Sequence, residues 1–295
     1  MADETSSSPA RSAQGPLRLG LVAGGGRFPI LVAEGARRRG VDVICVGIRH
    51  EVSPEVAGLC RSFRRIGLGK LGATFRYFHR HGVREVSWAG WIRKERIYSP
   101  WRLLSLLPDR RMLRFYFKKV RSHQDAALFA ALADEFESEG FNVIPSTKYC
   151  PELLAPEGIY TRRKPTSSEL ADIRFGWLIA KRLADLDVGQ SVAIYEKATL
   201  AVEGVEGTDR NIRRAGELCR RGGFVVVKLA KDRHDMRFDV PTVGPETIEA
   251  IREARGAVLA LEAGRTLIVD REALVEKADR YGIAVGGWTG PPGAQ

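Results

Sequence analysis

The stretch LRLGLVAGGGRFP, residues 17–29, decides the fold of the first half of this chain. It is a short apolar run that ends in three consecutive glycines, which is typical of a buried strand followed by a tight turn. The amphipathic residues 28–39 come next, and Gly40 closes them, which predicts a helix. VDVICV, residues 41–46, predicts a second buried strand. Together these elements form a βαβ unit, which predicts a parallel sheet with a right-handed crossover.

Helices and strands alternate on both sides of a segment rich in proline and glycine. The first half has further predicted helices at residues 71–80 and 126–139 and strands at 85–88 and 141–144. The second half has predicted helices at residues 169–187, 208–221, 245–255 and 271–281, and strands at 191–196, 200–203, 224–229, 258–261 and 266–269. Residues 151–165 hold three prolines and Gly158, and such a composition predicts a linker.

We therefore predict an α/β fold with two α/β domains, the N-terminal one built on a Rossmann-like parallel sheet. The N-terminal domain is expected at residues 16–150, the linker at 151–165 and the C-terminal domain at 166–290. Residues 1–15 are polar and rich in Ser and Ala, and they are expected to be a disordered tail without the apolar core of an export signal.

The charge, the apolar runs and the cysteines of the chain restrict its possible partners and its cellular compartment. Lys and Arg outnumber Asp and Glu by 47 to 36, a net charge of +11 that favours an acidic partner. Nucleic acid, anionic lipid and a phosphorylated substrate all satisfy that condition. No run approaches the ~18 apolar residues of a membrane-spanning helix. The four cysteines, Cys45, Cys60, Cys150 and Cys219, form no CxxC pair, so we expect buried free thiols in a reducing cytoplasm.

The glycine cluster Gly24, Gly25 and Gly26 is the first candidate site. Glycines after a buried strand let backbone N–H groups approach a phosphate at a helix N-terminus, although a plain tight turn explains them equally well. Pro29 stands where GxGxxG has its third glycine, and no acidic residue follows at the ribose position, so a nicotinamide dehydrogenase is disfavoured. Ala89-Gly90 ends another strand, at the edge where open α/β sheets bind ligands.

Two basic stretches have two interpretations each. Arg93, Lys94 and Arg96 could meet phosphate or form a solvated turn. Residues 101–119 mix Trp, Leu and Phe with Arg and Lys, a composition that suits a membrane interface with anionic lipid. A helix that packs on its own domain and leaves a basic face in water is the alternative.

The most informative loop follows the strand FVVVKL. Lys228 lies near the end of that strand, and the loop holds Lys231, Asp235, Arg237 and Asp239. The two aspartates could bind Mg²⁺, a hard cation that prefers oxygen ligands, and the cations could offset charge on a phosphorus under attack. A structural salt-bridge loop is the alternative that the residues alone leave open.

Eight segments in order extend the argument to nearly the whole chain. They are LGLVAGGGRFP, WAGWIRKERI, QDAAL, LLAPEG, LDVGQSVAI, AVEGVEGTD, KDRHDMRFDVPTVG and LEAGRTLIVDR. Together, from about residue 17 to near residue 287, the chain resembles the LpxI-type UDP-2,3-diacylglucosamine pyrophosphatases of lipid A biosynthesis. It departs from that pattern at residues 232–234, where related sequences tend to carry a proline.

The resemblance implies a two-domain enzyme that holds its UDP-linked diacylated glucosamine in a cleft between the domains. The implied reaction is Mg²⁺-dependent hydrolysis at the α-phosphorus to UMP and 2,3-diacylglucosamine 1-phosphate (lipid X). Asp239 takes the place of the essential aspartate, with Asp235 and Arg237 as catalytic neighbours and Asp239 and Asp235 as metal ligands. The expected substrate-binding residues are Gly24, Gly25, Gly26, Ala89, Gly90, Asp125, Glu206, Thr208, Asp209, Lys228 and Lys231.

These implications place the protein in the cytoplasm, peripheral to the cytoplasmic face of the inner membrane. A non-catalytic nucleotide-lipid-binding protein of the same fold is the main alternative. A nucleic-acid-binding protein is the second, and no nucleic-acid partner is expected, because the sequence has no helix-turn-helix, zinc or RNA-recognition signature. The oligomeric state stays open.

Overall fold

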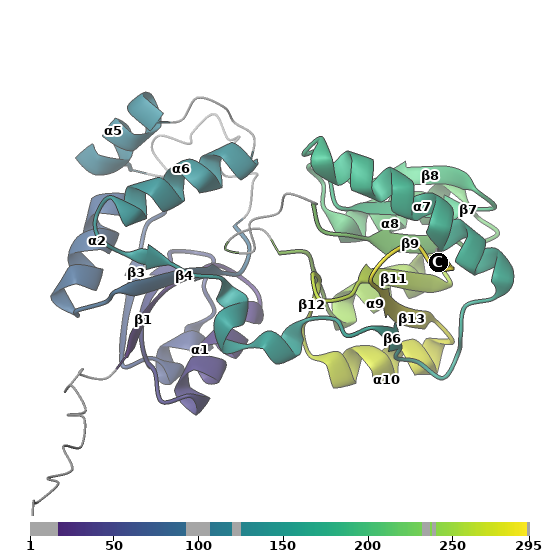
Figure 1. The fold of residues 1–295 in the computed structure, drawn as a ribbon, viewed down its shortest axis with the longest axis horizontal. Coiled ribbons are helices and arrows are strands. Elements are labelled where there is room, and N and C mark those ends of the chain that lie inside the picture. Colours follow the sequence, from purple (N-terminus) through teal and green to yellow (C-terminus); the bar gives the residue numbers. More distant parts are fainter. Residues whose placement is uncertain (1–16, 93–106, 120–124, 232–236, 238–239, 294–295) are drawn as a thin grey trace, which may run out of the picture.

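The structure is a computed structural model that describes residues 17–92, 107–119, 125–231, 237 and 240–293. Two α/β units lie beside each other, each around its own sheet, and a small two-stranded sheet belongs to the second unit (Figure 1). The predicted pair of α/β domains is therefore confirmed. No helix among the described residues has the length and apolar character needed to cross a bilayer.

The N-terminal sheet is parallel throughout and has the strand order β3-β2-β1-β4-β5. Its strands are β1 (Arg18–Ala23), β2 (Asp42–Ile48), β3 (Ser62–Ile66), β4 (Glu85–Ala89) and β5 (Asn142–Val143). The order runs outward in opposite directions from β1, which pairs with both β2 and β4. The sheet edge at the carboxyl ends of β1 and β4 is thus a topological switch point, which is the usual place of ligand binding in such sheets.

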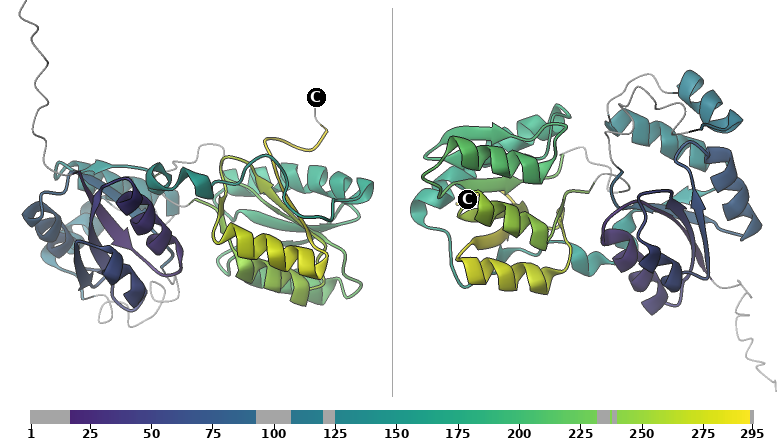
Figure 2. Two further views of the ribbon diagram at one scale, coloured as in Figure 1. Left: turned by 90° about the horizontal axis from the view of Figure 1, so that it is seen from below. Right: turned by 180° about the vertical axis from the view of Figure 1, so that it is seen from behind.

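Helices cover both faces of this sheet, as expected of alternating strands and helices (Figure 2). On one face lie α1 (Phe28–Arg38) and the short helices η1 (Pro54–Leu59) and η2 (Ser146–Tyr149). On the other lie α2 (Leu71–Arg80), α5 (Arg110–Lys119) and α6 (Asp125–Glu137). Helix α1 begins with Pro29 in its first turn, and its buried residues include Ile30, Val32, Ala33 and Ala36. These residues recur at helical spacing, so they lie on one side of α1 and pack against the sheet.

The C-terminal sheet is mixed, with strand order β6-β13-β11-β9-β7-β8. Its strands are β6 (Gly158–Ile159), β7 (Ser191–Tyr195), β8 (Ala198–Val202), β9 (Val225–Lys228), β11 (Val258–Glu262) and β13 (Ala284–Trp288). The central strands β9, β11 and β13 are parallel, so their carboxyl ends share one edge. Helix α7 (Ser167–Asp185) covers one face, and α8 (Thr208–Leu218), α9 (Pro245–Glu253) and α10 (Arg271–Tyr281) cover the other.

The predicted linker needs correction, because most of residues 151–165 belong to the second domain. The short helix η3 (Pro151–Leu153) precedes a backbone bridge between Leu154 and Leu267. The Ala155 N–H donates to the Thr266 carbonyl at 2.8 Å, and β6 then joins the edge of the sheet. Proline and glycine suggested a free connection, but the backbone polar groups of this segment find partners on the second domain.

Candidate active site

The glycine loop after β1 is packed directly against the end of β4. The Gly24 N–H donates to the Ala89 carbonyl and the Gly25 N–H to the Trp91 carbonyl, both at 2.8 Å. A Cβ atom on Gly24 would lie 2.5 Å from the Trp91 carbonyl oxygen. At Gly90, where φ is +89°, a Cβ would lie 2.4 Å from the Gly25 carbonyl oxygen. Only glycine allows the two chain segments to approach this closely.

This packing corrects the expectation that the Gly24 and Gly25 N–H groups cradle a phosphate. Both amides are bonded to backbone carbonyls, so they join β1 to β4 in the described conformation. The indole of Trp91 covers Gly25 and Gly26, and Trp91 as a residue is 50% exposed. Trp91 therefore presents an aromatic face at the switch point, a placement that the WAGW motif alone did not reveal.

Ion pairs between described residues connect the domains. Arg27, next to the glycine loop, places Nε 2.9 Å from Asp270 Oδ1, immediately before α10. Arg237 places Nη1 2.7 Å from Glu137 Oε1 at the end of α6. Arg27, at the switch-point edge of the first sheet, and Arg237, in the loop after β9, thus each contact the other domain. Asp125 is the first residue of α6, and its side chain lies outside the described part of the structure.

A buried cluster lies at the carboxyl end of β9, where the first turn of α8 meets the strand. Lys228 is the last residue of β9, and its side chain is 6% exposed. Its ammonium donates to the Thr208 hydroxyl, which in turn donates to Glu203 Oε1 at 3.1 Å. The Lys228 ammonium also lies 4.0 Å from Glu203 Oε2. Glu203, absent from the predicted site, is therefore the carboxylate that completes this cluster.

The cluster changes the role expected of Lys228. A cation with so little exposure has protein groups as its partners in this conformation, not a phosphate in the solvent. It holds the N-terminus of α8 against β9. Glu206 is also engaged within the protein, because its carboxylate accepts the Gly204 N–H at 3.1 Å and Arg214 Nη2 at 2.6 Å. The structure thus brings Thr208 and Lys228 into contact, and Glu206 supports the turn beside them. Their expected role in substrate binding stays a prediction.

Asp209 lies beside this cluster, and burial raises the pKa of its carboxyl group. The positive charges of Lys228 and Arg213 and a hydrogen bond from Thr247 oppose that shift, while the charge of Glu246 adds to it. Loss of hydration disfavours the ionised carboxylate, and its effect on the pKa exceeds the opposing effect of the neighbouring cations and the hydrogen bond.

Replacing Asp209 with asparagine is expected to flatten the dependence of stability on pH. The raised pKa means that the folded state holds the Asp209 proton more tightly than the unfolded state does. The corresponding stability is complete below the unfolded-state pKa, near 4, and is lost as pH rises through the folded-state pKa. Urea unfolding of both proteins between pH 4 and 8 tests this. Equal slopes for wild type and variant would contradict the assignment.

The two aspartates of the expected catalytic loop, Asp235 and Asp239, lie outside the described residues. Their described neighbour Lys231 donates from its ammonium to Asp187, and its carbonyl accepts Arg265 Nη2 at 2.6 Å. Within the described ranges, no three His, Cys, Asp or Glu side chains are grouped to hold a metal. The two expected ligands are not among those ranges, so the Mg²⁺ site stays a prediction.

Two hollows outlined by described residues lie away from this edge. One of about 520 Å³ is lined by the C-terminal parts of α8 and α9, including Arg213, Arg220 and Glu253. Another, of about 150 Å³, is lined by Arg64, Arg76 and Arg80 on the outer side of the first domain. The predicted cleft between the domains therefore stays a prediction.

The fold and the site together define a class: a two-domain α/β protein whose candidate site lies at the facing, carboxyl edges of two sheets. Residues 18–153 match the LpxI N-terminal domain and residues 156–286 the LpxI C-terminal domain. The chain belongs to the LpxI family.

An individual relative agrees with this family. The UDP-2,3-diacylglucosamine pyrophosphatase LpxI of Caulobacter vibrioides is 32% identical over 277 residues, which cover 91% of this chain and 96% of that protein. Among solved structures, the biotin carboxylase domain of a Hydrogenobacter thermophilus 2-oxoglutarate carboxylase matches 70% of this chain and 42% of its own. Its 13% identity and TM-score of 0.26 are too low to bear on function.

Proposed function

We propose that this chain is a UDP-2,3-diacylglucosamine pyrophosphatase of lipid A biosynthesis. Water attacks the α-phosphorus of the substrate, and the products are UMP and 2,3-diacylglucosamine 1-phosphate. The observation that carries the proposal is the similarity to the Caulobacter protein of that name, which extends through both domains. A similarity confined to one domain would support only a shared fold or a shared binding module.

The described geometry supports different roles for the two domains, with nucleotide binding in the first and catalysis in the second. The switch point of the N-terminal sheet, with the exposed face of Trp91, suits the nucleotide end of the substrate. The loop after β9 carries Asp239 and Asp235, and Arg237 in the same loop contacts α6 of the first domain. Asp239 acts as the catalytic carboxylate, and Arg237 offsets negative charge near the reacting phosphate.

Asp235 and Asp239 would hold the Mg²⁺ ion. Carboxylate oxygens are the ligands that this ion prefers, so the donor set fits. When bound, the ion would supply Lewis-acid polarisation of the phosphoryl group. The protein's own contribution is to place the two carboxylates on one short loop whose ends are held by the C-terminal domain.

The decisive experiment measures UMP release from UDP-2,3-diacylglucosamine by the purified protein, with Mg²⁺ and with EDTA. In H₂¹⁸O, attack at the α-phosphorus places the label in UMP, whereas attack at the β-phosphorus places it in the lipid product. We expect Mg²⁺-dependent release of labelled UMP. Binding of the substrate without UMP release would establish the non-catalytic alternative, and label in the lipid would contradict attack at the α-phosphorus.

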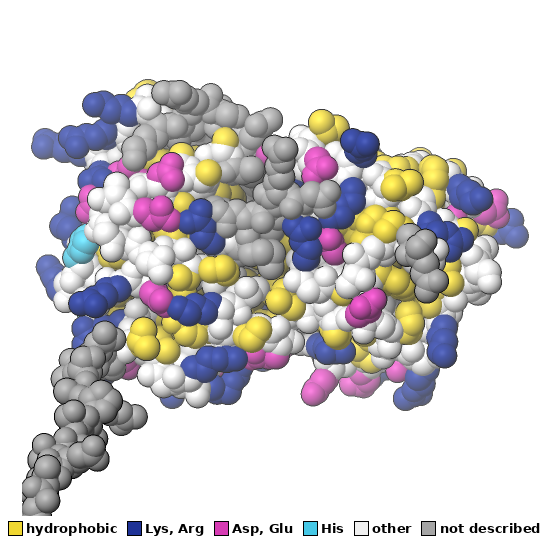
Figure 3. Space-filling view, viewed as in Figure 1, with side chains coloured by type: hydrophobic (Ala, Val, Ile, Leu, Met, Phe, Trp, Pro, Cys, Tyr) yellow, Lys and Arg dark blue, Asp and Glu magenta, His cyan; other side chains and the backbone are white. Residues whose placement is uncertain are grey.

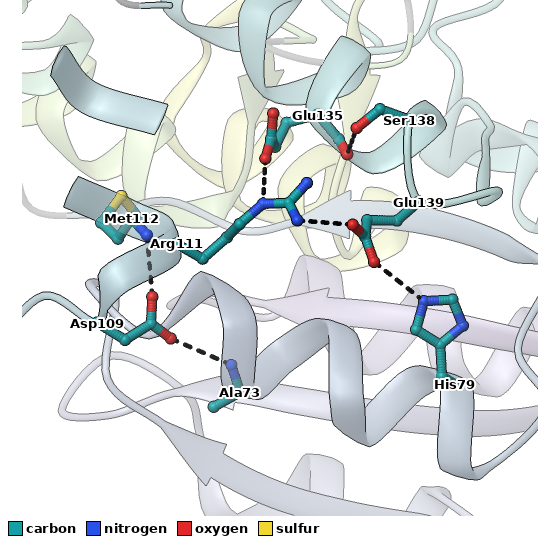
Figure 4. A network of polar contacts seen from close by, with 8 residues as sticks. All are labelled: Ala73, His79, Asp109, Arg111, Met112, Glu135, Ser138 and Glu139. Carbon is teal, nitrogen blue, oxygen red and sulfur yellow. Dashed lines mark hydrogen bonds and ion pairs between the residues drawn. The ribbon is translucent and has the colours of Figure 1, made fainter. Parts of the chain in front are cut away.

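We also propose that the enzyme works in the cytoplasm, at the surface of the inner membrane, with α5 as a membrane-facing element. Helix α5 is anchored to its own domain on one side (Figure 4). Asp109 accepts the Met112 N–H at 2.9 Å and the Ala73 N–H at 3.2 Å, which ties the start of α5 to α2. Arg111 pairs with Glu135 and places Nη1 2.7 Å from Glu139 Oε1, next to α6.

The other side of α5 is basic and apolar. Leu113 and Tyr116 are each 40% exposed, and Phe117 is 79% exposed. The exposed Arg110, Arg114 and Lys118 are interleaved with them, and Lys and Arg side chains gather at this end of the molecule (Figure 3). Apolar side chains among cations suit the interface of an anionic bilayer. The sequence left a packed helix and a membrane-facing stretch as alternatives. The described α5 packs on its own domain with one side and exposes a basic, apolar side, which supports the proposal, while a simply solvated face stays the alternative.

Phe117→Ser is expected to weaken binding to phosphatidylglycerol-containing vesicles about tenfold, because one exposed aromatic ring no longer enters the bilayer interface. Sedimentation with vesicles measures the effect. Leu218→Ser, which removes a 64% exposed apolar residue on α8 in the other domain, is the matched control and should bind as wild type does. An equal loss in both variants, or no loss in either, would contradict a docking role for α5.

A further inference from the structure

A buried carboxylate that the proposed chemistry does not use lies at the carboxyl end of β11. Glu262 is 5% exposed and accepts hydrogen bonds from three donors. Lys181 Nζ lies 2.7 Å and Arg265 Nη1 3.4 Å from Oε1, and the Ala230 N–H donates to Oε2 at 2.8 Å. A buried charge is tolerated only when it is paired and hydrogen-bonded in this way.

Glu262 and its two cations bind the backbone at the start of the expected catalytic loop. Glu262 binds the N–H of Ala230, and Lys181 Nζ donates to the Ala230 carbonyl at 3.1 Å. Arg265 Nη2 donates to the carbonyl of the next residue, Lys231, at 2.6 Å. Three charged side chains, from α7, β11 and the turn after β11, therefore fix the backbone of two residues.

The same stretch of chain also holds the other end of the loop. The Leu267 N–H donates to the Pro241 carbonyl at 2.7 Å. Strand β10 (Thr242–Val243) then pairs in parallel with β12 (Leu267–Ile268). Thr266, Leu267 and Ile268 are at most 1% exposed, so they form a rigid support. Both ends of the segment that carries Asp239 are thus attached to residues 262–268.

We infer that Glu262 is a positioning residue, which sets where Asp239 lies by fixing Ala230 without touching the substrate itself. The inference rests on the proposed function of Asp239. A carboxylate can fix Ala230 in this way because both of its oxygens accept hydrogen bonds, one from Lys181 and one from the Ala230 N–H. A misplaced catalytic group lowers kcat much more than it weakens substrate binding.

Glu262→Gln tests this requirement with almost no change of shape. A glutamine must turn its NH₂ group toward either Lys181 or the Ala230 N–H, so one donor faces another donor. We expect kcat for UMP release to fall roughly 10- to 100-fold, with KM changed less than about threefold. Glu276→Gln is the matched control, since Glu276 Oε1 also lies 2.7 Å from its cation, Arg280, but its side chain is 72% exposed. An unchanged kcat in Glu262→Gln would overturn the inference.

A second variant separates positioning from general stability. Glu262→Met combined with Lys181→Met removes both buried charges, so the melting temperature should recover relative to Glu262→Met alone. The Ala230 N–H still lacks its carboxylate, and kcat should therefore stay low. Recovery of kcat together with the melting temperature would show that Glu262 serves only the fold.

Hydrogen exchange followed by mass spectrometry gives a readout that does not depend on activity. In Glu262→Gln, peptides that cover residues 229–242 should exchange faster, while those of α10 stay as in wild type. If wild type releases no UMP, the proposed function fails, yet this exchange result still decides whether Glu262 orders the segment. Unchanged exchange in residues 229–242 would overturn the inference even in an active enzyme.

Discussion

Replacing Asp239 with alanine is expected to lower kcat for UMP release about 10³-fold, the size of effect usual for a positioned acid–base group. The change removes the carboxylate proposed here as catalytic and keeps every other residue of the loop. Binding of the nucleotide-lipid substrate should persist, because the N-terminal domain and the remaining loop residues are unchanged. The measurement is steady-state UMP release together with equilibrium binding of the intact substrate.

Two controls sharpen this prediction. Asp42→Ala removes an aspartate of the first domain whose Oδ2 lies 3.1 Å from Arg61 Nη1, at the opposite end of β2 from the candidate site. Its kcat should equal that of wild type. Asp235→Ala should weaken the dependence on Mg²⁺ concentration as well as kcat. If Asp239→Ala keeps more than a tenth of the wild-type kcat, the catalytic assignment is wrong.

Lys228→Met is expected to lower the free energy of unfolding by about 3 kcal/mol, because a buried carboxylate loses its cation. The Lys228 side chain is 6% exposed, and Glu203 and Asp209 both lie in its field. Methionine fills a similar volume, so the loss comes from charge and not from a cavity. Urea unfolding at pH 7.5 measures the difference.

The matched control is Lys148→Met. Lys148 Nζ lies 2.6 Å from Glu85 Oε1, but its side chain is 43% exposed, so water replaces the lost partner and the change should stay within about 1 kcal/mol. Adding Asp209→Asn to Lys228→Met should restore part of the stability by removing one uncompensated charge. A loss below 1 kcal/mol in Lys228→Met would show that the cluster is hydrated and not held together by this cation.

The local sequence pattern was enough to predict those helices and strands that have a clear apolar periodicity. The helices α2 and α10 were predicted with the bounds that the structure has, Leu71–Arg80 and Arg271–Tyr281. The strand, glycine turn and helix at the start correctly predicted the parallel pairing of β1 with β2. These features depend on residues close in sequence, whose spacing is visible without knowledge of the fold.

Other strands were missed because their neighbours, and not their own residues, make them strands. Strand β3 carries the exposed Arg64 and Arg65 at the sheet edge, and β13 contains Gly286 and Gly287. In β13, a Cβ atom on Gly287 would lie 2.3 Å from the Pro156 carbonyl oxygen, so the approach of the chain segment before β6 requires glycine there. Such a requirement arises between segments more than 100 residues apart.

The sequence by itself determined the two α/β domains, the parallel N-terminal sheet and the family to which the chain belongs. Tertiary structure decided which polar groups face one another: the Gly24 and Gly25 amides with β4, Lys228 with Glu203 and Thr208, and Glu262 with Ala230. The reason is physical, because periodicity records which side of an element is apolar, whereas burial and pairing of charges depend on distances across the fold. A lysine at the end of a strand that faces water is indistinguishable, in sequence, from one that lies buried against a carboxylate.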